Sequence, residues 1–170
     1  MPLYVKYGIA LEAHLQNSIA TFNQDGSLSK IYIRDFEGLR IDETQLNKMG
    51  YKTSHFHKKS RILTQSTTSV FNKVFYSTVQ NHLAELILTI TEKVENMDFE
   101  KIMWHHISHI IQDILAKLTD VDTGRIQKIT HTLFAATIDY KCVTTMRLED
   151  EAHHYTCLLY TSPSPRDKRQ

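Results

Sequence analysis

Two long stretches of this chain carry apolar residues at helical spacing, and they leave few folds open to it. Residues 68–95 and 98–118 each place large apolar side chains three or four positions apart, so each predicts an amphipathic helix. Residues 124–139 have the same spacing, and Asp98 is a candidate N-cap for the second helix. The chain has only 5 Gly and 3 Pro, which suits long helices with few turns. The apolar positions of the first two stretches are Phe71, Val74, Phe75, Val79, Leu83, Leu86, Ile87, Ile90 and Val94, and then Phe99, Ile102, Met103, Ile107, Ile110, Ile111, Ile114 and Leu118.

The N-terminal part combines a predicted helix with a predicted β-hairpin. Residues 4–23 place apolar side chains at helical spacing and predict a helix. Alternation over residues 28–34 predicts a strand, and residues 39–41 resume the alternation. We therefore expect one hairpin whose corner is Asp35–Gly38. Residues 42–50 predict a short helix or loop that ends at a glycine.

Two further segments are less regular. Residues 51–66 are polar and aperiodic and predict a loop, whereas residues 140–149 fit a helix or a strand equally well. Together with the helices and the hairpin, these segments predict an α+β fold class that is mostly helical with one β-hairpin.

The end of the chain has a composition of its own. All prolines other than Pro2 lie in the last eight residues. The segment CLLYTSPSPRDKRQ, residues 157–170, resembles a conceptual translation of the transposon-end adapter used in sequencing libraries. We therefore divide the chain into residues 1–156, which carry the fold, and a disordered tail of residues 157–170.

Composition excludes several classes of protein. The formal net charge is +1 for the whole chain and becomes −1 without the tail, so net charge gives no argument for binding to nucleic acid or to a membrane surface. No apolar run is long enough for a transmembrane helix, and the N-terminus has no cleavage-site pattern of a signal peptide. Two cysteines, Cys142 and Cys157, do not make a disulfide framework, which favours a cytoplasmic protein.

The stretch Glu12-Ala-His14-Leu-Gln16-Asn17 concentrates four polar side chains within six residues. Arg34-Asp35 follows later, at a predicted strand end before a glycine turn. Carboxylates of Glu12 and Asp35, with Asn17 between them, would form an oxygen-rich pocket of the kind that Mg²⁺ takes together with substrate phosphates. His14 and Gln16 would donate to phosphate or carboxylate oxygens. By spacing alone, a purely structural role for these residues stays open.

The runs YGIALEAHLQNSIATF and RDFEGLRI resemble the C-terminal half of the NRPS-independent siderophore synthetases, the aerobactin-synthetase (IucA/IucC) family. The resemblance covers Tyr7 to about Glu149, and it includes Asn81-His82-Leu83, Trp104, and Lys141 followed by Met146-Arg147-Leu148. It implies that residues 1–156 are the palm part of a cupped-hand enzyme. Such enzymes activate a carboxylate of citrate or a related polycarboxylate with ATP and Mg²⁺. An amine or hydroxyl then attacks the acyl-adenylate, and an amide or ester forms.

The resemblance also implies roles for individual residues. Glu12 and Asp35 hold Mg²⁺, and the nucleotide-binding residues are His14, Gln16 and Asn17. Two basic residues, Lys141 and Arg147, pair with a substrate carboxylate. No residue is implied as a covalent nucleophile, because positioning and charge neutralisation are enough for attack on the α-phosphate.

This sequence departs from the family in its length. The family's enzymes are several times longer, and their phosphate-gripping basic loop has no counterpart here. The sequence therefore predicts a fragment of a larger gene product, in which Met1 is an internal methionine and which is inactive alone. The resemblance allows a homodimer of the full-length enzyme, and neither nucleic acid nor a membrane is an expected partner.

Two other functions fit some of the same residues. The spacing of Glu12, His14 and Asn17, followed by Asp35, parallels the catalytic loop and metal-binding Asp of kinase-like small-molecule phosphotransferases. In that case Glu12 is the base. The number of matched motif elements favours the synthetase. A non-catalytic helical binding module is the third interpretation, and it predicts no Mg²⁺-dependent affinity for nucleotide.

The remaining chemistry-bearing residues fit structural roles better. His105 and His109 lie four positions apart on a predicted helix, but no third zinc ligand accompanies them, so we expect solvated surface histidines. His82 lies on an apolar stripe, which predicts a hydrogen-bonded core histidine. Trp104 is expected to pack, and Cys142 to be an ordinary thiol.

Overall fold

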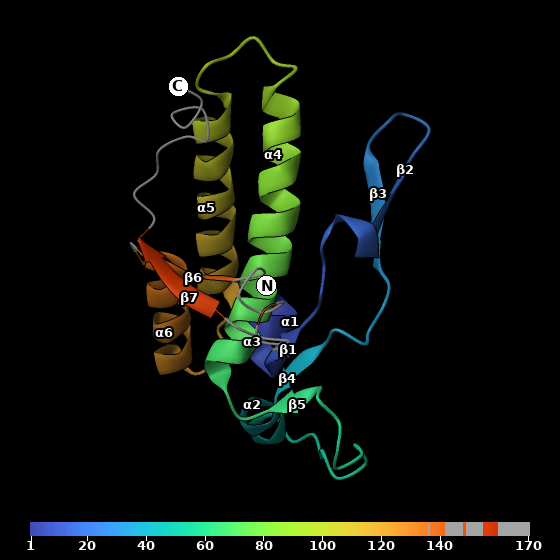
Figure 1. Ribbon diagram of the computed structural model, residues 1–170, viewed down its shortest axis with the longest axis vertical. Helices are drawn as coiled ribbons and strands as arrows, with labels where there is room; N and C mark the ends of the chain where they lie inside the picture. The colour runs from blue at the N-terminus through green and yellow to red at the C-terminus, as the bar shows by residue number, and fades with distance from the viewer. Residues whose placement is uncertain (136, 142–147, 149–154, 160–170) are drawn as a thin grey trace. The chain divides into compact units, whose positions relative to one another are not determined.

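The computed structural model describes residues 1–135, 137–141, 148 and 155–159 (Figure 1). The chain forms two compact units, Met1–Ile126 and Gln127–Gln170, and each is described by itself. Helices and small sheets make up the described part, which confirms the predicted α+β class.

A long helix and its antiparallel neighbour account for much of the first unit. The long helix runs through α3 (Thr67–Val74), the π-helical segment η2 (Phe75–Leu83) and α4 (Ala84–Thr91). Helix α5 (Phe99–Lys117) returns beside α4 (Figure 1). The two long helices predicted from apolar spacing are therefore confirmed. A π-helical stretch is unusual, and such stretches are frequent at functional sites.

The two long helices begin differently. The Ser66 hydroxyl accepts a hydrogen bond from the backbone N–H of Ser69 at 3.2 Å, so Ser66 is the N-cap of α3. Asp98 occupies the N-cap position of α5, as predicted, but its side chain makes no capping hydrogen bond. The backbone N–H of Asp98 instead donates to the Asn96 side chain at 3.0 Å.

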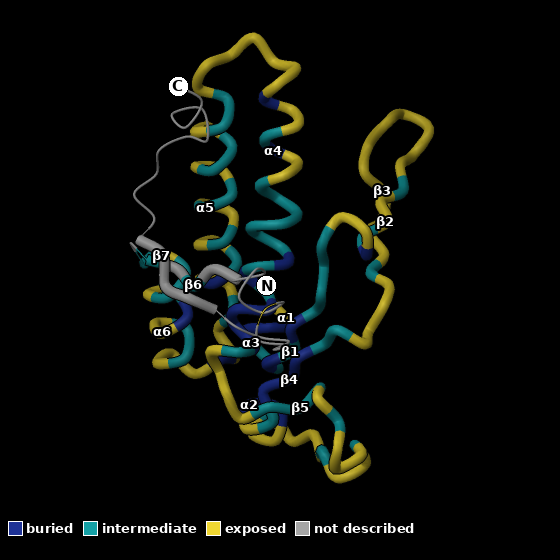
Figure 2. The backbone as a smooth tube through the Cα atoms, in the orientation of Figure 1, coloured by how far each residue is buried: buried dark blue, intermediate teal, exposed yellow. Residues whose placement is uncertain are grey.

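The core of the first unit lies where α3 meets the N-terminal segments (Figure 2). The rings of Tyr4, Phe71 and Phe75 pack in series, with centroid distances of 6.4 and 5.5 Å. The buried apolar residues of this region are Tyr4, Val5, Ala10, Ile41, Leu46, Val70, Phe71 and Phe75. Burial of these side chains is the main favourable term that holds the N-terminal segments on the helix.

The predicted helix over residues 4–23 is wrong beyond its first turns. Helix α1 (Pro2–Tyr7) ends at Gly8, whose φ of 72° is the left-handed C-cap conformation that glycine adopts freely. A Cβ at this position would lie 2.6 Å from Cβ of Asp42. The chain then enters β1 (Ile9–Ala10), so glycine at position 8 both ends the helix and lets two backbones approach.

A three-stranded sheet follows from that turn. Strand β4 (Arg40–Asp42) lies in the middle, antiparallel to β1 and parallel to β5 (Leu63–Thr64). Ile9 pairs with Ile41, and Ile41 pairs with Leu63. The predicted loop over residues 51–66 therefore contains one short strand near its end.

The β-hairpin is real, but its predicted partner strand and corner are wrong. Strand β2 (Ser18–Phe22) pairs antiparallel with β3 (Leu28–Ile33), and the turn between them holds Asp25 and Gly26. Gly26 has a φ of 82°, and the Asp25 carboxylate accepts from the Ser27 backbone N–H at 2.9 Å. The turn is closed by two backbone hydrogen bonds, from Asn23 N–H to the Ser27 carbonyl at 2.9 Å and from Gly26 N–H to the Asn23 carbonyl at 3.0 Å.

Helix α2 (Glu43–Lys48) confirms the short helix predicted over residues 42–50. Asp42 is its N-cap and accepts from the Gln45 backbone N–H at 2.9 Å. The second carboxylate oxygen of Asp42 lies 3.3 Å from the Arg125 guanidinium, which also donates to the carbonyls of Val5 (2.7 Å) and Tyr4 (3.2 Å). Arg125 thus ties the end of α1 to the start of α2.

Replacement of Arg125 by methionine tests this tie. We expect Arg125→Met to lower the free energy of unfolding by about 2 kcal/mol, because the Asp42 carboxylate is almost fully buried and loses its charged partner. Thermal or urea unfolding of the chain measures the loss. Lys128→Met, an exposed site on the same helix, is the control and is expected to change stability by less than about 0.5 kcal/mol. Equal stabilities of the two variants would contradict the tie.

The C-terminal part departs from prediction at one boundary. Helix α6 (Thr123–Leu133) ends earlier than the predicted helix over residues 124–139, and β6 (Thr137–Lys141) follows. Thr137, Ile138 and Tyr140 are β-branched or aromatic, which favours a strand over a continued helix. Strand β6 pairs antiparallel with β7 (Tyr155–Leu159).

The predicted tail and the ambiguous segment lie partly within these strands. Strand β7 runs on through Cys157–Leu159, so the first part of the expected disordered tail is paired with β6. Residues 160–170 lie outside the described residues, and the division after residue 156 stays a prediction. Of the ambiguous segment 140–149, Tyr140 and Lys141 belong to β6.

Among the described residues, no helix is both long and apolar enough to cross a membrane.

Candidate functional site

The first motif lies in a loop and a single 3₁₀ turn, η1 (Leu15–Asn17), between β1 and the hairpin. The side-chain amide of Asn17 donates to the Glu12 carbonyl at 3.1 Å and closes this loop. Asn17 is only 5% exposed. A compact loop therefore holds the polar residues of the motif. They do not lie along a helix, as the apolar spacing over residues 4–23 predicted.

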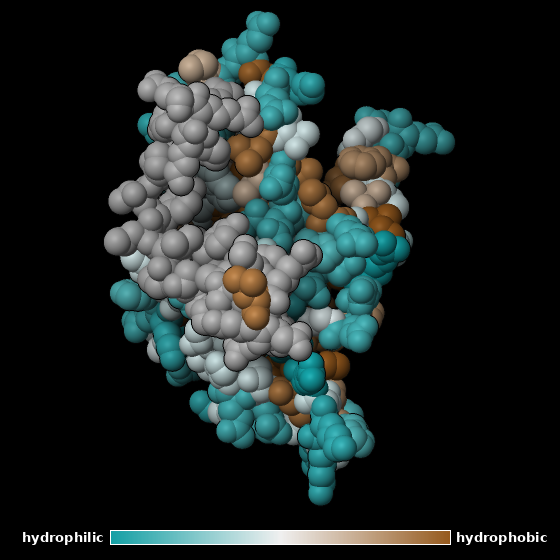
Figure 3. Space-filling model, viewed as in Figure 1, coloured by the Kyte–Doolittle hydropathy of each residue, from teal (hydrophilic) through white to brown (hydrophobic). Residues whose placement is uncertain are grey.

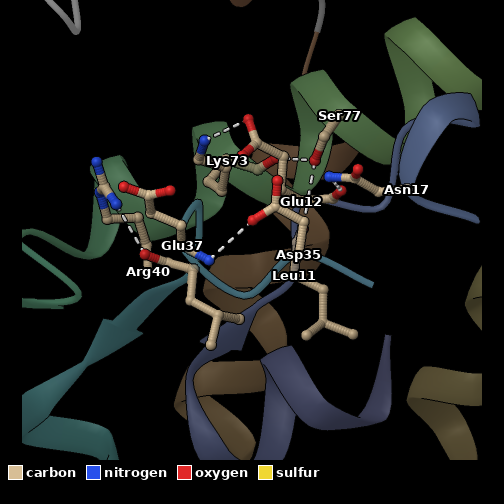
Figure 4. A network of polar contacts seen from close by, with 9 residues as sticks. Leu11, Glu12, Asn17, Asp35, Glu37, Arg40, Lys73 and Ser77 are labelled. Carbon is tan, nitrogen blue, oxygen red and sulfur yellow. Dashed lines mark hydrogen bonds and ion pairs between the residues drawn. The ribbon is translucent and has the colours of Figure 1, made fainter. Parts of the chain in front are cut away.

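The Glu12 carboxylate points towards the long helix (Figure 4). Its Oε1 lies 2.8 Å from Nζ of Lys73 on α3, in an ion pair whose Lys73 side chain is 10% exposed. One turn further along, the Ser77 hydroxyl donates to the Leu11 carbonyl at 3.3 Å. The helix thus fixes both the backbone and the charge of the loop.

Lys73 and Ser77 were missed by sequence reasoning. The available signal is a polar pair four positions apart on a helix that is otherwise buried around Val70, Phe71 and Phe75. A lysine is almost never buried without a partner, so a lysine on such a face predicts a nearby carboxylate. The sequence alone does not say which carboxylate that is.

The two motifs meet at Gly38. A Cβ on Gly38 would lie 1.5 Å from Oε2 of Glu12, so the glycine leaves the space that the carboxylate fills. The base of the hairpin adds two further links, because the Arg34 backbone N–H donates to the Asn17 carbonyl at 2.9 Å and the Arg34 Nε donates to the Gln16 carbonyl at 3.2 Å. The motifs, separate in sequence, therefore form one site.

Asp35 occupies the turn between β3 and β4. Its φ of 61° is the left-handed region, which Asp tolerates better than most residues because its short side chain bonds the local backbone. The Asp35 carboxylate accepts from the Glu37 backbone N–H at 3.2 Å and is exposed. Figure 4 shows the bond of Asp35 to Glu37 beside the contacts of Glu12.

His14 and Gln16 present their side chains beside this network. His14 precedes η1 in extended backbone conformation, and its imidazole makes no capping bond to the turn. The Gln16 side chain is exposed, while its carbonyl is held by Arg34. The Gln16 side chain is therefore open to an external ligand, whereas His14 is half-buried.

His82 supports the loop from η2. Its Nδ1 lies 2.9 Å from the Ala13 carbonyl, and since a carbonyl only accepts, Nδ1 carries the proton. The Ser18 hydroxyl lies 3.4 Å from the same nitrogen. The predicted hydrogen-bonded histidine is thus confirmed, although the residue is half-buried rather than fully in the core.

The proposed carboxylate-binding residues are not brought into this site. Lys141 is the last residue of β6 in the second unit, and only its backbone is described. Arg147 lies outside the described residues. Both assignments stay predictions.

The donor set fits Mg²⁺ when a nucleotide supplies the remaining ligands. Glu12 and Asp35 offer hard carboxylate oxygens, which Mg²⁺ prefers. Within the described residues, no three side chains of His, Cys, Asp or Glu gather closely enough to hold a metal ion. A site with two carboxylates matches the usual Mg²⁺ arrangement, in which one or two carboxylates are completed by phosphates and water.

The histidine pair on α5 stands apart from this site. His105 and His109 are exposed, and their Nε2 atoms lie 3.0 Å apart as a hydrogen-bonded pair. Their exposure agrees with the predicted surface position.

Residues 1–156 match the family model described as "Ferric iron reductase FhuF-like transporter". The fold and this match define an α+β FhuF-like domain. A solved structure with a similar fold is the petrobactin biosynthesis protein AsbB from Bacillus anthracis str. Sterne. It has a TM-score of 0.69 at 24% sequence identity, over 86% of this chain and 25% of that chain.

The similar curated proteins identify the family more closely. The chain is 59% identical to the D-ornithine–citrate ligase of Staphylococcus aureus (strain NCTC 8325 / PS 47) over 98% of its own length and 26% of the ligase. It is 25% identical to the staphyloferrin A synthase of the same strain, over 95% of this chain and 26% of the synthase. The chain belongs to the family of NRPS-independent siderophore synthetases, as the resemblance predicted, and spans about a quarter of the length of these relatives.

Proposed function

We propose that this chain is the part of a siderophore synthetase that holds Mg²⁺ and the nucleotide during adenylation of a citrate-type carboxylate. The complete enzyme then joins that carboxylate to an amine or hydroxyl. The 59% identity to a D-ornithine–citrate ligase supports this reaction class, with citrate and an amine as the substrates. The description of the matched family model refers to iron reduction and transport, whereas the curated relatives favour ligation.

The observation that carries the proposal is the contact between Glu12 and Gly38. It joins the loop that bears His14, Gln16 and Asn17 to the turn that bears Asp35. The ion pair with Lys73 occupies Oε1 of Glu12, which leaves Oε2, the oxygen beside Gly38, for a ligand. Oε2 of Glu12 is therefore the oxygen that we assign to the metal side of the site.

In this proposal, Glu12 and Asp35 hold Mg²⁺, which neutralises charge on the nucleotide phosphates when it is bound. Lys73 holds Glu12 in one rotamer, so little reorganisation is needed on binding. His14 and Gln16 donate to phosphate or ribose oxygens. Asn17 contributes through its side-chain oxygen, since its amide nitrogen, its backbone N–H and its carbonyl are already hydrogen-bonded within the fold.

The chemistry then needs no covalent protein nucleophile. A carboxylate oxygen of the citrate-type substrate attacks the α-phosphorus of ATP, the bond to the β,γ-phosphates breaks, and pyrophosphate leaves. The amine or hydroxyl next attacks the acyl carbon, loses a proton, and AMP leaves. The residues of this chain contribute position and charge. Lys141 and Arg147 remain our candidates for pairing with a substrate carboxylate.

The reaction class is tested with a chimeric synthetase, defined as the S. aureus ligase in which residues 1–156 of this chain replace the matching stretch. We expect the chimeric synthetase to release pyrophosphate and AMP from ATP, Mg²⁺, citrate and D-ornithine. We expect the isolated chain to show no turnover, because it spans only about a quarter of the relatives. A coupled pyrophosphate assay and chromatography of the nucleotides measure both.

The products separate the candidate functions. ADP in place of AMP would identify a phosphotransferase. Absence of any Mg²⁺-dependent nucleotide binding by a folded chimeric synthetase would leave the non-catalytic binding module. Robust turnover by the isolated chain would show that the remaining parts of the enzyme are dispensable. The unmodified S. aureus ligase, assayed in parallel, is the positive control.

A further inference from the structure

Two side chains of the π-helical segment η2 contact the loop on either side of Glu12. The Ser77 hydroxyl lies 3.3 Å from the Leu11 carbonyl (Figure 4). The Nδ1–H of His82 donates to the Ala13 carbonyl at 2.9 Å. These two carbonyls belong to the residues directly before and after Glu12, so one helix fixes the backbone of Glu12 from both sides.

The bond from His82 is the stronger of the two contacts. A serine hydroxyl carries one proton, and that of Ser77 is also within hydrogen-bond distance of the Lys73 carbonyl of its own helix. Its bond to the loop is therefore shared. The other oxygen near Nδ1 of His82 is the Ser18 hydroxyl, which is farther away at 3.4 Å. The proton on Nδ1 is thus directed at the Ala13 carbonyl.

The π-helical conformation of η2 explains how His82 reaches the loop. Ser77 and His82 are five residues apart within η2. In an α-helix, with about 3.6 residues per turn, two residues at this separation point about 140° away from each other. In a π-helix the hydrogen bonds run from residue i to residue i+5, so residues five apart lie on the same face. The wider turn therefore places both donors on the face that meets the loop.

The β2–β3 hairpin gives the loop little support within this chain. Every residue of β3 except Ile33 is exposed. Figure 3 shows hydrophilic side chains at the free end of the hairpin and apolar side chains exposed along its strands. A two-stranded hairpin is only marginally stable by itself in water. The position of Glu12 therefore depends mainly on the contacts from the long helix.

We propose that His82 is a positioning residue for the metal side of the candidate site. Its bond to Ala13 holds the peptide next to Glu12. The Glu12 carboxylate then keeps Oε1 on Lys73 and Oε2 beside Gly38. Residues that orient a metal ligand through hydrogen bonds contribute to metal affinity without touching the metal. The role of Oε2 as a ligand rests on the proposed function, whereas the contact of His82 with the loop does not.

Two substitutions of His82 in the chimeric synthetase test the role of the donor. His82→Leu removes it, and His82→Asn keeps an N–H close to the place of Nδ1. We expect His82→Leu to raise the Mg²⁺ concentration for half-maximal pyrophosphate release on the order of tenfold, and His82→Asn to stay within about threefold of the unsubstituted enzyme. Ile87→Val, at a buried site in α4, controls for a general loss of stability and is expected to leave the Mg²⁺ dependence unchanged.

Amide hydrogen exchange measures the contact without turnover. In the absence of ATP, the amides of residues 12–16 are expected to exchange on the order of tenfold faster in His82→Leu than in His82→Asn. His82→Gln replaces His82→Leu if the latter does not fold, because its amide nitrogen lies near the place of Nε2 instead of Nδ1. His82→Leu combined with Asn81→His moves the imidazole to the position that an α-helix would require. We expect this double variant to recover neither measurement.

Four results overturn the proposal. They are normal Mg²⁺ dependence of a folded His82→Leu variant, equal losses in His82→Leu and His82→Asn, recovery by Asn81→His, and an equal change in Mg²⁺ dependence in Ile87→Val. Faster exchange with unchanged Mg²⁺ dependence is an instance of the first, because the contact then exists without positioning a metal ligand. Absence of adenylation by the unsubstituted chimeric synthetase, with exchange that still depends on the donor, overturns the proposed function and leaves the contact of His82 with the loop in place.

Discussion

Gly38→Ala is expected to lower adenylation by the chimeric synthetase on the order of 10²-fold or more. The added Cβ would lie 1.5 Å from Oε2 and 2.6 Å from Cδ of Glu12, so the carboxylate cannot stay in place. Rotation of Glu12 breaks its ion pair with Lys73 and leaves that largely buried ammonium group without its partner. Pyrophosphate release, measured over a range of Mg²⁺ concentrations, reports the loss.

The control for Gly38→Ala is the same substitution at a glycine where an added Cβ has more space. A Cβ on Gly124 would approach only Oδ1 of Asp122, at 3.2 Å, so Gly124→Ala is expected to keep adenylation within about twofold. A melting curve for each variant separates loss of fold from loss of the site. Wild-type adenylation by a folded Gly38→Ala variant would remove the Glu12 carboxylate from the metal side of the site.

The helical part of the fold could be predicted because its signal is long and periodic. The stretches 68–95 and 98–118 repeat their apolar spacing over many turns, and the structure places helices there. The N-terminal part failed for a local reason. Leu11, Leu15 and Ile19 satisfy helical spacing, yet Gly8 has already ended α1, and the first two of these residues lie in a loop and in η1. A glycine that ends a helix therefore outweighs the helical spacing of the apolar side chains that follow it.

The hairpin shows a related limit. The alternation over β3 predicts the strand itself, but its partner is β2, which precedes it, and not the segment that follows it. The Asp25–Gly26 turn carries the stronger hairpin signal, while the Asp35–Gly38 turn leads into β4, which pairs with β1 and β5. The chain order of strands does not by itself say which of two turns joins paired strands.

The residues of the candidate site come from short motifs, whereas the contacts that hold them do not follow from any local pattern. The spacing and the family resemblance predict Glu12 and Asp35 as partners, and in the structure Glu12 contacts Gly38 in the turn that Asp35 opens. Lys73 was missed because it lies 61 residues from Glu12, and no local pattern links a helix lysine to a particular distant carboxylate. The roles of the site residues stay predictions until variants are assayed.

Asp35→Asn is the sharpest of these variants, and we expect it to reduce adenylation on the order of 10³-fold. Asparagine tolerates the φ of 61° at this position, and its side-chain oxygen still accepts from the Glu37 N–H. Only the negative charge is lost, so the fold and the turn are expected to be unchanged. The loss is therefore assigned to the metal, which binds a carboxylate far better than an amide in a site with few protein ligands.

Two controls decide how this loss is interpreted. Asp25→Asn makes the same chemical change in the exposed hairpin turn and is expected to leave adenylation unaltered. Asp35→Gly keeps the positive φ and removes the side chain, so it should lose as much activity as Asp35→Asn if charge is what counts. Partial rescue of Asp35→Asn by higher Mg²⁺ concentration is expected from a weakened metal site. Full activity of Asp35→Asn at low Mg²⁺ concentration would place the metal elsewhere and leave Asp35 as a turn residue, stabilised only by its bond to Glu37.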